Sequence, residues 1–131
     1  MKFLLDSNAV IELLKGNPAV SERARRFEPA DFGLPAVVAH ELYFGAFKSN
    51  RTAVHLARLD ALRFDVVAFD REDARRAGEV RALLASRGTP VGGYDTLIAG
   101  QTLARRLTLI THNVRDFARV PGLTFEDWQD A

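Results

Sequence analysis

The sequence of 131 residues contains no cysteine. Disulfide bonds and thiolate metal sites are therefore excluded, and any metal site must use oxygen or imidazole ligands. A chain without cysteine also suits a reducing compartment, and we expect a cytoplasmic location.

A long hydrophobic run is also missing. The longest apolar stretch, around residues 35–47, is interrupted by His40 and Glu41 and is too short to cross a bilayer. The N-terminus shows no basic region followed by an apolar segment and a small-residue cleavage site, so a signal peptide is not expected. We therefore expect a soluble protein that does not associate with membranes.

Neither sign of charge is in large excess. Lys and Arg number 18 and Asp and Glu 17, and this net charge of +1 does not by itself indicate a nucleic-acid partner. Several arginines nevertheless lie in pairs, such as Arg75 and Arg76. If some of the acids bind a divalent cation, the remaining surface is more basic than the sum suggests. The simpler alternative is that these pairs lie on ordinary solvated helix faces.

Short β-type segments alternate with longer helical segments, without an internal repeat, low-complexity tract or linker. Because the hydrophobic fraction of 47% is ample for one core, we assign residues 1–131 to a single domain. The alternation predicts an α/β fold, in which a central, mostly parallel sheet of four to five short strands is flanked by helices. The predicted strands are 2–5, 32–34, 66–69, 107–111 and 123–125. The predicted helices are 7–15, 18–27, 35–49, 53–62, 71–86, 95–104 and 113–117.

Acidic and amide residues lie where predicted strands end and predicted helices begin. Asp6 follows the first strand, Asp95 opens a helix after a glycine-rich loop, and Asn113 and Asp116 follow the strand at 107–111. In open α/β sheets, ligands bind beyond the carboxyl ends of the strands. We therefore expect these side chains at one edge of the sheet.

Glu41 lies inside the helix predicted at 35–49, and this helix follows a strand, so its first turns also belong at that edge. The apolar face of this helix is expected to comprise Val37, Val38, Leu42, Phe44 and Phe47. A carboxylate on such a face has no obvious partner. Taken singly, the other acids have simpler explanations: Asp6, Ser7 and Asp95 suit helix caps, and Asp116 suits an exposed surface.

The four acids together indicate a functional site more strongly than any one of them does alone. Carboxylates brought together without buried cations repel one another and raise each other's pKa. A divalent cation relieves this repulsion, and oxygen ligands favour Mg²⁺, or Mn²⁺, over zinc. Since Mg²⁺ usually keeps several waters and contacts substrate phosphates, the pattern points to phosphoryl chemistry.

Three segments carry a resemblance to a known family: LLDSNAVIELL at residues 4–14, PAVVAHELYFGAFKS at 35–49 and VGGYDTLIAGQTLARRLTLITHNVRDFARVPGLTFEDW at 91–128. In their order and spacing, and in total length, the chain resembles PIN-domain ribonucleases, and most closely the VapC-type toxins of bacterial toxin–antitoxin systems. The resemblance covers essentially the whole chain and implies a single PIN-like domain.

The resemblance implies a catalytic, metal-binding centre of Asp6, Glu41 and Asp95, with a fourth acid near the end of the strand at 107–111. Many PIN domains have an acid where this chain has Asn113. The chain departs from the wider pattern here, and Asp116 is the better candidate for the fourth acid.

The resemblance also implies residues that support the centre, namely Asn8, Thr111 and Asn113. Their expected role is to hold the acids in place by hydrogen bonds. A helix cap for Asn8 and a strand-end hydroxyl for Thr111 remain equal alternatives. Basic residues that could hold flanking phosphates are Arg115, Arg119 and Lys48, without preference among them.

The implied activity is hydrolysis of RNA phosphodiester bonds. The implied cofactor is Mg²⁺, with Mn²⁺ as an alternative. The implied partners are RNA, a second copy of the chain in a homodimer, and a small antitoxin protein whose segment covers the acidic cleft. Apolar residues within 10–14 and 54–62 are expected to form contact surfaces, or else they complete the core.

Two alternatives stay open at this stage. A PIN-like scaffold that binds RNA or protein without cutting is the main one. A phosphatase of the haloacid-dehalogenase type is disfavoured, because Asn8 stands where a second Asp is needed. The histidines His40, His55 and His112 show no metal-ligand spacing, and we assign them no role.

Overall fold

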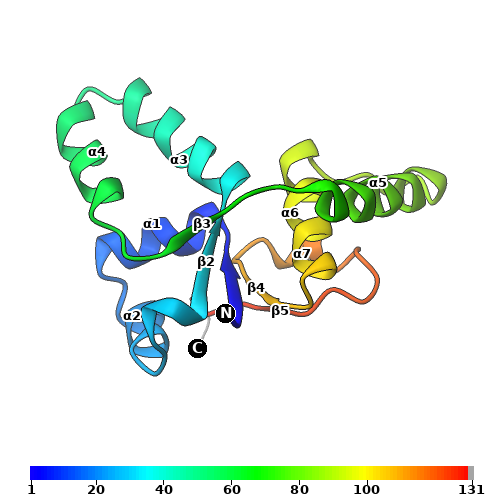
Figure 1. The fold of residues 1–131 in the computed structure, drawn as a ribbon, viewed down its shortest axis with the longest axis horizontal. Helices are drawn as coiled ribbons and strands as arrows, with labels where there is room; N and C mark the ends of the chain where they lie inside the picture. The colour runs from blue at the N-terminus through cyan, green and yellow to red at the C-terminus, as the bar shows by residue number, and fades with distance from the viewer. Residues whose placement is uncertain (130–131) are drawn as a thin grey trace.

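Five short parallel strands form one sheet that is flanked by helices (Figure 1). The computed structural model describes residues 1–129. The strands are β1 (Phe3–Leu5), β2 (Phe32–Pro35), β3 (Asp65–Val67), β4 (Thr108–Ile110) and β5 (Phe125–Glu126). The helices are α1 (Ser7–Lys15), α2 (Pro18–Ala24), α3 (Ala36–Lys48), α4 (Thr52–Asp60), α5 (Arg71–Ser86), α6 (Gly93–Ala104) and α7 (Val114–Phe117), with a 3₁₀ turn at Pro29–Asp31. The predicted α/β class and parallel sheet are confirmed.

The strand order is β3-β2-β1-β4-β5, which places β1 between β2 and β4. Leu5 pairs with Ile110, and the next residue, Asp6, donates its N–H to the Ile110 carbonyl at 3.0 Å. Because the strands run parallel, β1, β2 and β4 all end at one edge, which we call the carboxyl edge. Figure 1 shows the first turns of α3 and α6 on either side of this edge.

The centre of the core is formed by β1 and β4. Leu4, Leu5 and Leu109 are fully buried, and Ile110 is nearly so. Residues on both faces of these strands are apolar, as expected where helices cover both sides of a parallel sheet. Within residues 1–129, no helix has the length and apolar character needed to span a membrane.

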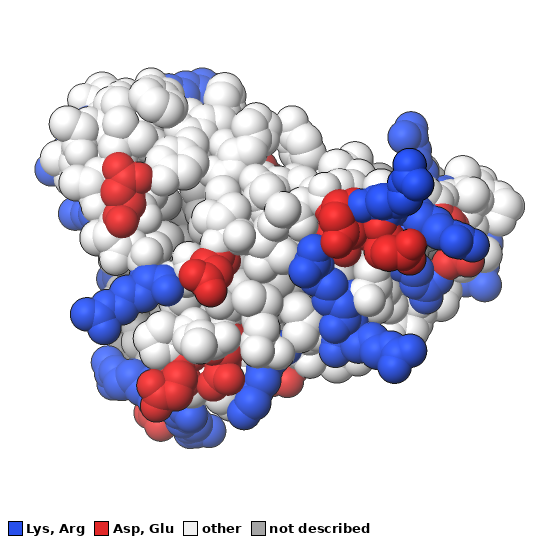
Figure 2. All heavy atoms as spheres, viewed as in Figure 1, with Lys and Arg blue, Asp and Glu red and all other residues white. Residues whose placement is uncertain are grey.

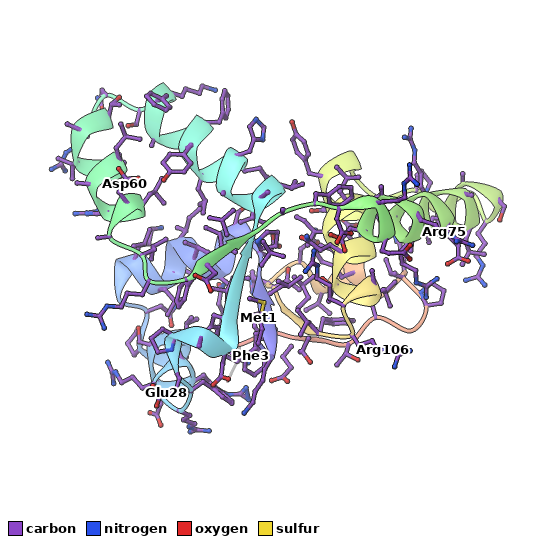
Figure 3. The ribbon with its side chains drawn as sticks, in the orientation of Figure 1. Met1, Phe3, Glu28, Asp60, Arg75 and Arg106 are labelled. Carbon is purple, nitrogen blue, oxygen red and sulfur yellow. The ribbon has the colours of Figure 1, made fainter. Side chains whose placement is uncertain are left out.

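An aromatic cluster of Phe3, Phe27, Phe32 and Trp128 closes the opposite end of the sheet. The ring centroids of Phe3 and Phe27 lie 4.7 Å apart, and the Phe27 ring stacks on Trp128 at 6.0 Å. Figure 3 shows Phe3 at the end of the sheet that lies away from α3. Trp128 is only 2% exposed, so the segment that follows β5 is packed firmly against the sheet.

Helices α5 and α6 pack closely because small residues meet at their contact. A side-chain carbon at Gly100 would overlap the backbone of Ala77. Beside this contact, the carboxylate of Asp73 is buried and accepts hydrogen bonds from Arg105 Nε at 3.2 Å and Gln101 Nε2 at 3.0 Å. These interactions hold α6, and therefore its first turn, in a fixed position at the carboxyl edge.

Helix α3 buries a narrower face than the sequence pattern predicts. Val38, Leu42 and Ala46 are buried, whereas Phe44 is 60% exposed and Phe47 is 66% exposed. The prediction that Phe44 and Phe47 share one apolar face with Val38 and Leu42 was wrong, because positions 44 and 47 point away from the helix face formed by positions 38, 42 and 46. The outer side of α3 therefore presents two large aromatic rings to solvent.

Element boundaries follow the predictions closely where capping signals are strong. The helices predicted at 7–15 and 71–86 have these bounds in the structure. Asp70 caps the second of them, and its carboxylate accepts the Asp73 N–H at 3.0 Å. The helix predicted to open at Asp95 instead begins at Gly93, so Asp95 lies in its first turn and does not cap it.

Candidate active site

Asp6 lies at the junction of β1 and α1 and has two roles in the local structure. Its Oδ1 accepts the Ser7 N–H at 2.7 Å, so Asp6 itself is the N-cap of α1, and Ser7 is not. Its Oδ2 accepts a hydrogen bond from Thr111 Oγ1 at 2.8 Å. The residue is 6% exposed. Burial raises the pKa of the Asp6 carboxyl, and the bonds from Thr111 and Ser7 partly offset that rise.

Glu41 and Asp95 reach the same region from α3 and α6. Burial and then the negative charge of Asp6 raise the pKa of Glu41. The pKa of Asp95 is raised from 3.8 to about 6, first by burial and then by the charges of Asp6, Asp116 and Glu41. The carboxylates are therefore close enough to destabilise one another's ionised forms.

Asn113 links Asp95 to Asp116. Its Nδ2 donates to Oδ2 of Asp95 and to Oδ2 of Asp116, each at 3.2 Å. Its backbone N–H donates to Thr111 Oγ1 at 3.0 Å. A chain of hydrogen bonds therefore runs from Asp116 through Asn113 and Thr111 to Asp6, and it joins the residues that follow β4 to the end of β1.

An open cleft of about 430 Å³ lies at the carboxyl edge. It is lined by Asp6, Ser7, Asn8, Glu41, Asp95, His112 and Asn113. Asp116 does not line this cleft and lies behind Asn113, where Arg119 Nη1 approaches its Oδ1 at 3.7 Å. The structure thus brings Asp6, Glu41 and Asp95 to one surface and connects Asp116 to them through an amide.

Asn8 and Lys48, two further residues that the sequence singled out, are not hydrogen-bonded to the acids within the described part of the chain. Asn8 is exposed at the cleft, and within residues 1–129 its side chain forms no hydrogen bond to Asp6 or to another group. Lys48 lies at the far end of α3, where its Nζ is 5.7 Å from the centre of the Phe44 ring. Among the three basic candidates, none lines the cleft.

His112 was given no role from the sequence, yet it lines the cleft beside the acids. Its Nδ1 lies 3.0 Å from Oδ2 of Asp127. The available signal was its place between Thr111 and Asn113, directly after the strand that ends at the carboxyl edge.

The residues at the cleft fit a hard divalent cation. Among residues 1–129, the ionisable groups that line it are three carboxylates and the imidazole of His112, without a Lys or Arg. Ser7, Asn8 and Asn113 add hydroxyl and amide oxygens to the residues that line the cleft. Such an oxygen-rich donor set suits Mg²⁺ or Mn²⁺. In the described part of the chain, no three His, Asp or Glu side chains are grouped so that they could hold a metal ion by themselves, and Mg²⁺ in proteins typically needs only one or two carboxylates besides water and substrate phosphate.

Charged side chains elsewhere are unevenly distributed. Figure 2 shows Lys and Arg gathered with acids over the α5 arm and around α2, whereas the surface over α3 and α4 is largely uncharged on this face.

The chain matches a protein family, curated relatives and solved structures over nearly its whole length. The family model described as PIN domain matches residues 3–123. The chain is 36% identical to the tRNA(fMet)-specific endonuclease VapC of Salmonella typhimurium and 38% identical to that of Shigella flexneri, in each case over 98% of both chains. In the crystal structure of DNA-bound VapBC from Salmonella typhimurium, a chain with 37% identity superposes with a TM-score of 0.92, again over 98% of both chains. A chain of VapBC-1 from nontypeable Haemophilus influenzae, with 29% identity, superposes with a TM-score of 0.88 over 98% of both chains. The chain therefore belongs to the PIN-domain family, in its VapC-type branch of ribonuclease toxins.

Proposed function

We propose that this protein is a Mg²⁺-dependent endoribonuclease that acts as the toxin of a toxin–antitoxin pair. The observation that carries the proposal is the meeting of Asp6, Glu41 and Asp95 in one open cleft, with Asp116 tied to Asp95 through Asn113. The names of the VapC relatives as endonucleases support the same activity. Burial, and then the charges of Asp6, Asp116 and Glu41, raise the Asp95 pKa to about 6, and acids perturbed in this way cluster at catalytic sites more than on a non-catalytic scaffold.

The cation would be held by Asp6, Glu41 and Asp95, with Asp116 as the fourth acid. When bound, Mg²⁺ or Mn²⁺ would neutralise charge on the scissile phosphate and lower the pKa of an attacking water. The chain's own contribution is to fix the ligands. Thr111 holds Oδ2 of Asp6, and Asn113 holds one oxygen each of Asp95 and Asp116. Bonds of this kind keep carboxylates oriented before the substrate arrives.

The substrate we propose is RNA, and the relatives' specificity makes initiator tRNA(fMet) the first substrate to test. Of the basic candidates, Arg115 is exposed and forms no ion pair within residues 1–129, whereas Arg119 approaches Asp116 and the Pro90 carbonyl. Arg115 is therefore the better placed of the two to bind a flanking phosphate.

We propose that the antitoxin occupies an apolar groove of about 470 Å³ between α1, α3 and α4. The groove is lined by Ile11, Leu14, Leu42 and Leu59, and it reaches Ser7 and Glu41 at the cleft. Solved relatives are toxin–antitoxin complexes, as their titles state. A segment bound in this groove could extend to the acids and block RNA. Val10, expected earlier as a possible contact, is fully buried and belongs to the core.

We further propose that the chain forms a homodimer through the outer side of α3. Phe44 and Phe47 are 60% and 66% exposed and lie three residues apart on one helix. Large aromatic rings exposed together are typical of protein interfaces, where their burial stabilises association.

The nuclease proposal is tested by incubating the purified protein with an initiator tRNA(fMet) transcript and with total RNA, in Mg²⁺ and in EDTA. Cleavage at discrete positions in Mg²⁺, and none in EDTA, is the expected result. Intact RNA under both conditions, with metal-independent thermal stability, would favour the non-catalytic scaffold instead.

A further inference from the structure

Among the residues that the structure describes, His112 is the one lining the cleft whose side chain can bind a second proton and become cationic. The other lining residues are carboxylates or neutral polar groups. An RNA backbone that approaches three carboxylates meets repulsion at every phosphate not neutralised by metal. A cationic hydrogen-bond donor at the rim of such a cleft is therefore well placed to hold a phosphate.

The position of the His112 ring is fixed by Asp127. Nδ1 lies 3.0 Å from Oδ2 of Asp127. An ionised carboxylate only accepts hydrogen bonds, so Nδ1 carries the proton that the two atoms share. Nε2 is then the ring nitrogen left for the cleft, and in the imidazolium form its N–H is free to donate.

Asp127 is held in place by its surroundings, whereas the acid of an ordinary surface ion pair is free to move in solvent. Its side chain is 13% exposed, and its Oδ1 accepts the Gln129 N–H at 2.9 Å. The following residue, Trp128, is buried in the aromatic cluster. The carboxylate that orients His112 therefore belongs to a packed segment.

The sheet brings these two residues together. β5 pairs with β4 in parallel, with Ile110 opposite Glu126, and Thr111 N–H donates to the Glu126 carbonyl at 3.0 Å. His112 lies two residues after the end of β4, and Asp127 lies one residue after the end of β5, so both are at the carboxyl edge. The pairing of β5 with β4 thus places the Asp127 carboxylate beside His112.

We propose that His112 is a substrate-binding residue that donates from Nε2 to a backbone phosphate oxygen of the RNA, and that Asp127 is a positioning residue acting through it. The inference rests on the proposed ribonuclease function and adds a subsite to it. A charge-assisted bond of this kind strengthens RNA binding in the ground state and in the transition state alike. Loss of His112 therefore raises KM and leaves kcat nearly unchanged.

The test measures binding of a fluorescently labelled tRNA(fMet) transcript by anisotropy in EDTA, across roughly 50–200 mM salt. His112→Ala is expected to weaken binding about tenfold and to reduce the slope of log K against log salt by about 0.7 to 0.9, the value of one phosphate contact. His112→Lys, which keeps a cationic donor, is expected to restore the slope and most of the affinity. Arg26→Ala is the matched control, because it removes an exposed charge that is paired with Glu22 and does not line the cleft.

The role of Asp127 is tested by a double-mutant cycle. Asp127→Ala is expected to weaken binding about as much as His112→Ala, and the double variant no more than either single one. Asp127→Asn, which preserves the shape of the side chain, serves if the alanine variant unfolds, and it should give a smaller loss. Additive losses in the cycle would show that Asp127 does not act through His112.

Two outcomes separate this inference from the function on which it rests. If wild-type protein cleaves the tRNA in Mg²⁺ but His112→Ala binds with unchanged affinity and slope, the phosphate contact is refuted and the nuclease stands. If affinity falls while the slope is unchanged and lysine does not rescue it, His112 contacts another part of the RNA, and the proposal is refuted too. If the wild type neither binds nor cleaves RNA, the proposed function fails and this subsite with it.

Discussion

The hydroxyl of Thr111 donates a hydrogen bond of 2.8 Å to the carboxylate of Asp6, although 105 positions separate the two residues in the sequence. The bond exists because β1 and β4 are neighbours and end in register at the carboxyl edge. Thr111 is 1% exposed and also accepts the Asn113 N–H. One hydroxyl thus orients the residue at the end of β1 and the loop that follows β4.

Replacing Thr111 by valine tests this arrangement with little change in volume. The variant should remain folded but require more metal, because Asp6 loses the bond that helps to lower its pKa and fix its orientation. Loss of such a supporting bond typically weakens metal binding about 10- to 100-fold. The readout is the Mg²⁺ concentration that gives half-maximal RNA cleavage. A Thr111→Ser variant should keep the wild-type value, and an unchanged value in Thr111→Val would contradict the role assigned to this bond.

The raised pKa of Asp95 predicts how stability depends on pH without metal. Its pKa rises from 3.8 to about 6 in the folded protein, so the unfolded chain releases this proton more readily. Stability linked to Asp95 is full below about pH 4 and is lost as pH rises through about 6. Because the site is open to solvent, we expect Asp95→Asn to stabilise the metal-free protein by only about 1 kcal/mol at pH 7.

Urea unfolding in EDTA at pH 5 and pH 8 measures this effect. In EDTA, the difference in the free energy of unfolding between Asp95→Asn and wild type should increase from pH 5 to pH 8. In Mg²⁺ this difference should shrink or reverse, because the ion binds the ionised site of the wild type. Asn is a suitable replacement because its side-chain oxygen can still accept from Asn113 Nδ2. A variant that is less stable than wild type in EDTA at pH 8 would show that the acids do not repel one another as described.

The buried pair of Asp73 and Arg105 should behave in the opposite way. Burial acts to raise the pKa of Asp73, but hydrogen bonds from Arg105, the Asp70 N–H and Gln101 outweigh it and hold the pKa below its usual value. Stability linked to Asp73 is therefore present at neutral pH and is lost as pH falls through the lowered pKa. Asp73→Ala should destabilise the protein by about 2–4 kcal/mol, because it leaves Arg105 and Gln101 without their partner.

The control variant for Asp73→Ala is Arg76→Ala, which removes an exposed ion pair with Glu79 on the same helix. Such a surface pair is expected to contribute less than about 1 kcal/mol. Both variants are measured by urea unfolding at pH 7. Equal and small effects would show that the Asp73 network is not what holds α5 against α6.

Exposure of Phe44 and Phe47 predicts self-association. Replacing both with glutamate should convert the proposed dimer to a monomer, because it places charges in an apolar interface, while the fold is unaffected since neither side chain is buried. Size-exclusion chromatography with light scattering gives the mass directly. The matched control is Val66→Glu, at another exposed apolar residue, which is 59% exposed on β3. A wild-type protein that is monomeric at micromolar concentration would refute the dimer.

The sequence predicted the parts of this structure that depend on local signals and on strand direction. Helix 71–86 was placed correctly because Asp70 is a strong cap, and the meeting of Asp6, Glu41 and Asp95 followed from the parallel order of the strands. Neither required knowledge of side-chain packing.

Phe44 and Phe47 were assigned to the wrong face because their apolar character was given more weight than their positions on the helix. Other features depend on contacts that the sequence pattern does not encode. The contact between His112 and Asp127 depends on the pairing of β5, a strand of two residues. So short a strand carries little pattern, and the partner of His112 was therefore not predictable.

The proposed active site is tested most directly by Mg²⁺-dependent RNA cleavage by Asp6→Asn, compared with wild type at equal protein concentration and with unfolding midpoints measured in parallel. We expect a folded protein whose cleavage rate falls by about 100-fold or more, because a neutral amide replaces a carboxylate of the proposed metal centre. A folded Asp6→Asn protein that cuts the same RNA at the wild-type rate would contradict the assignment of the acidic cleft as the active site.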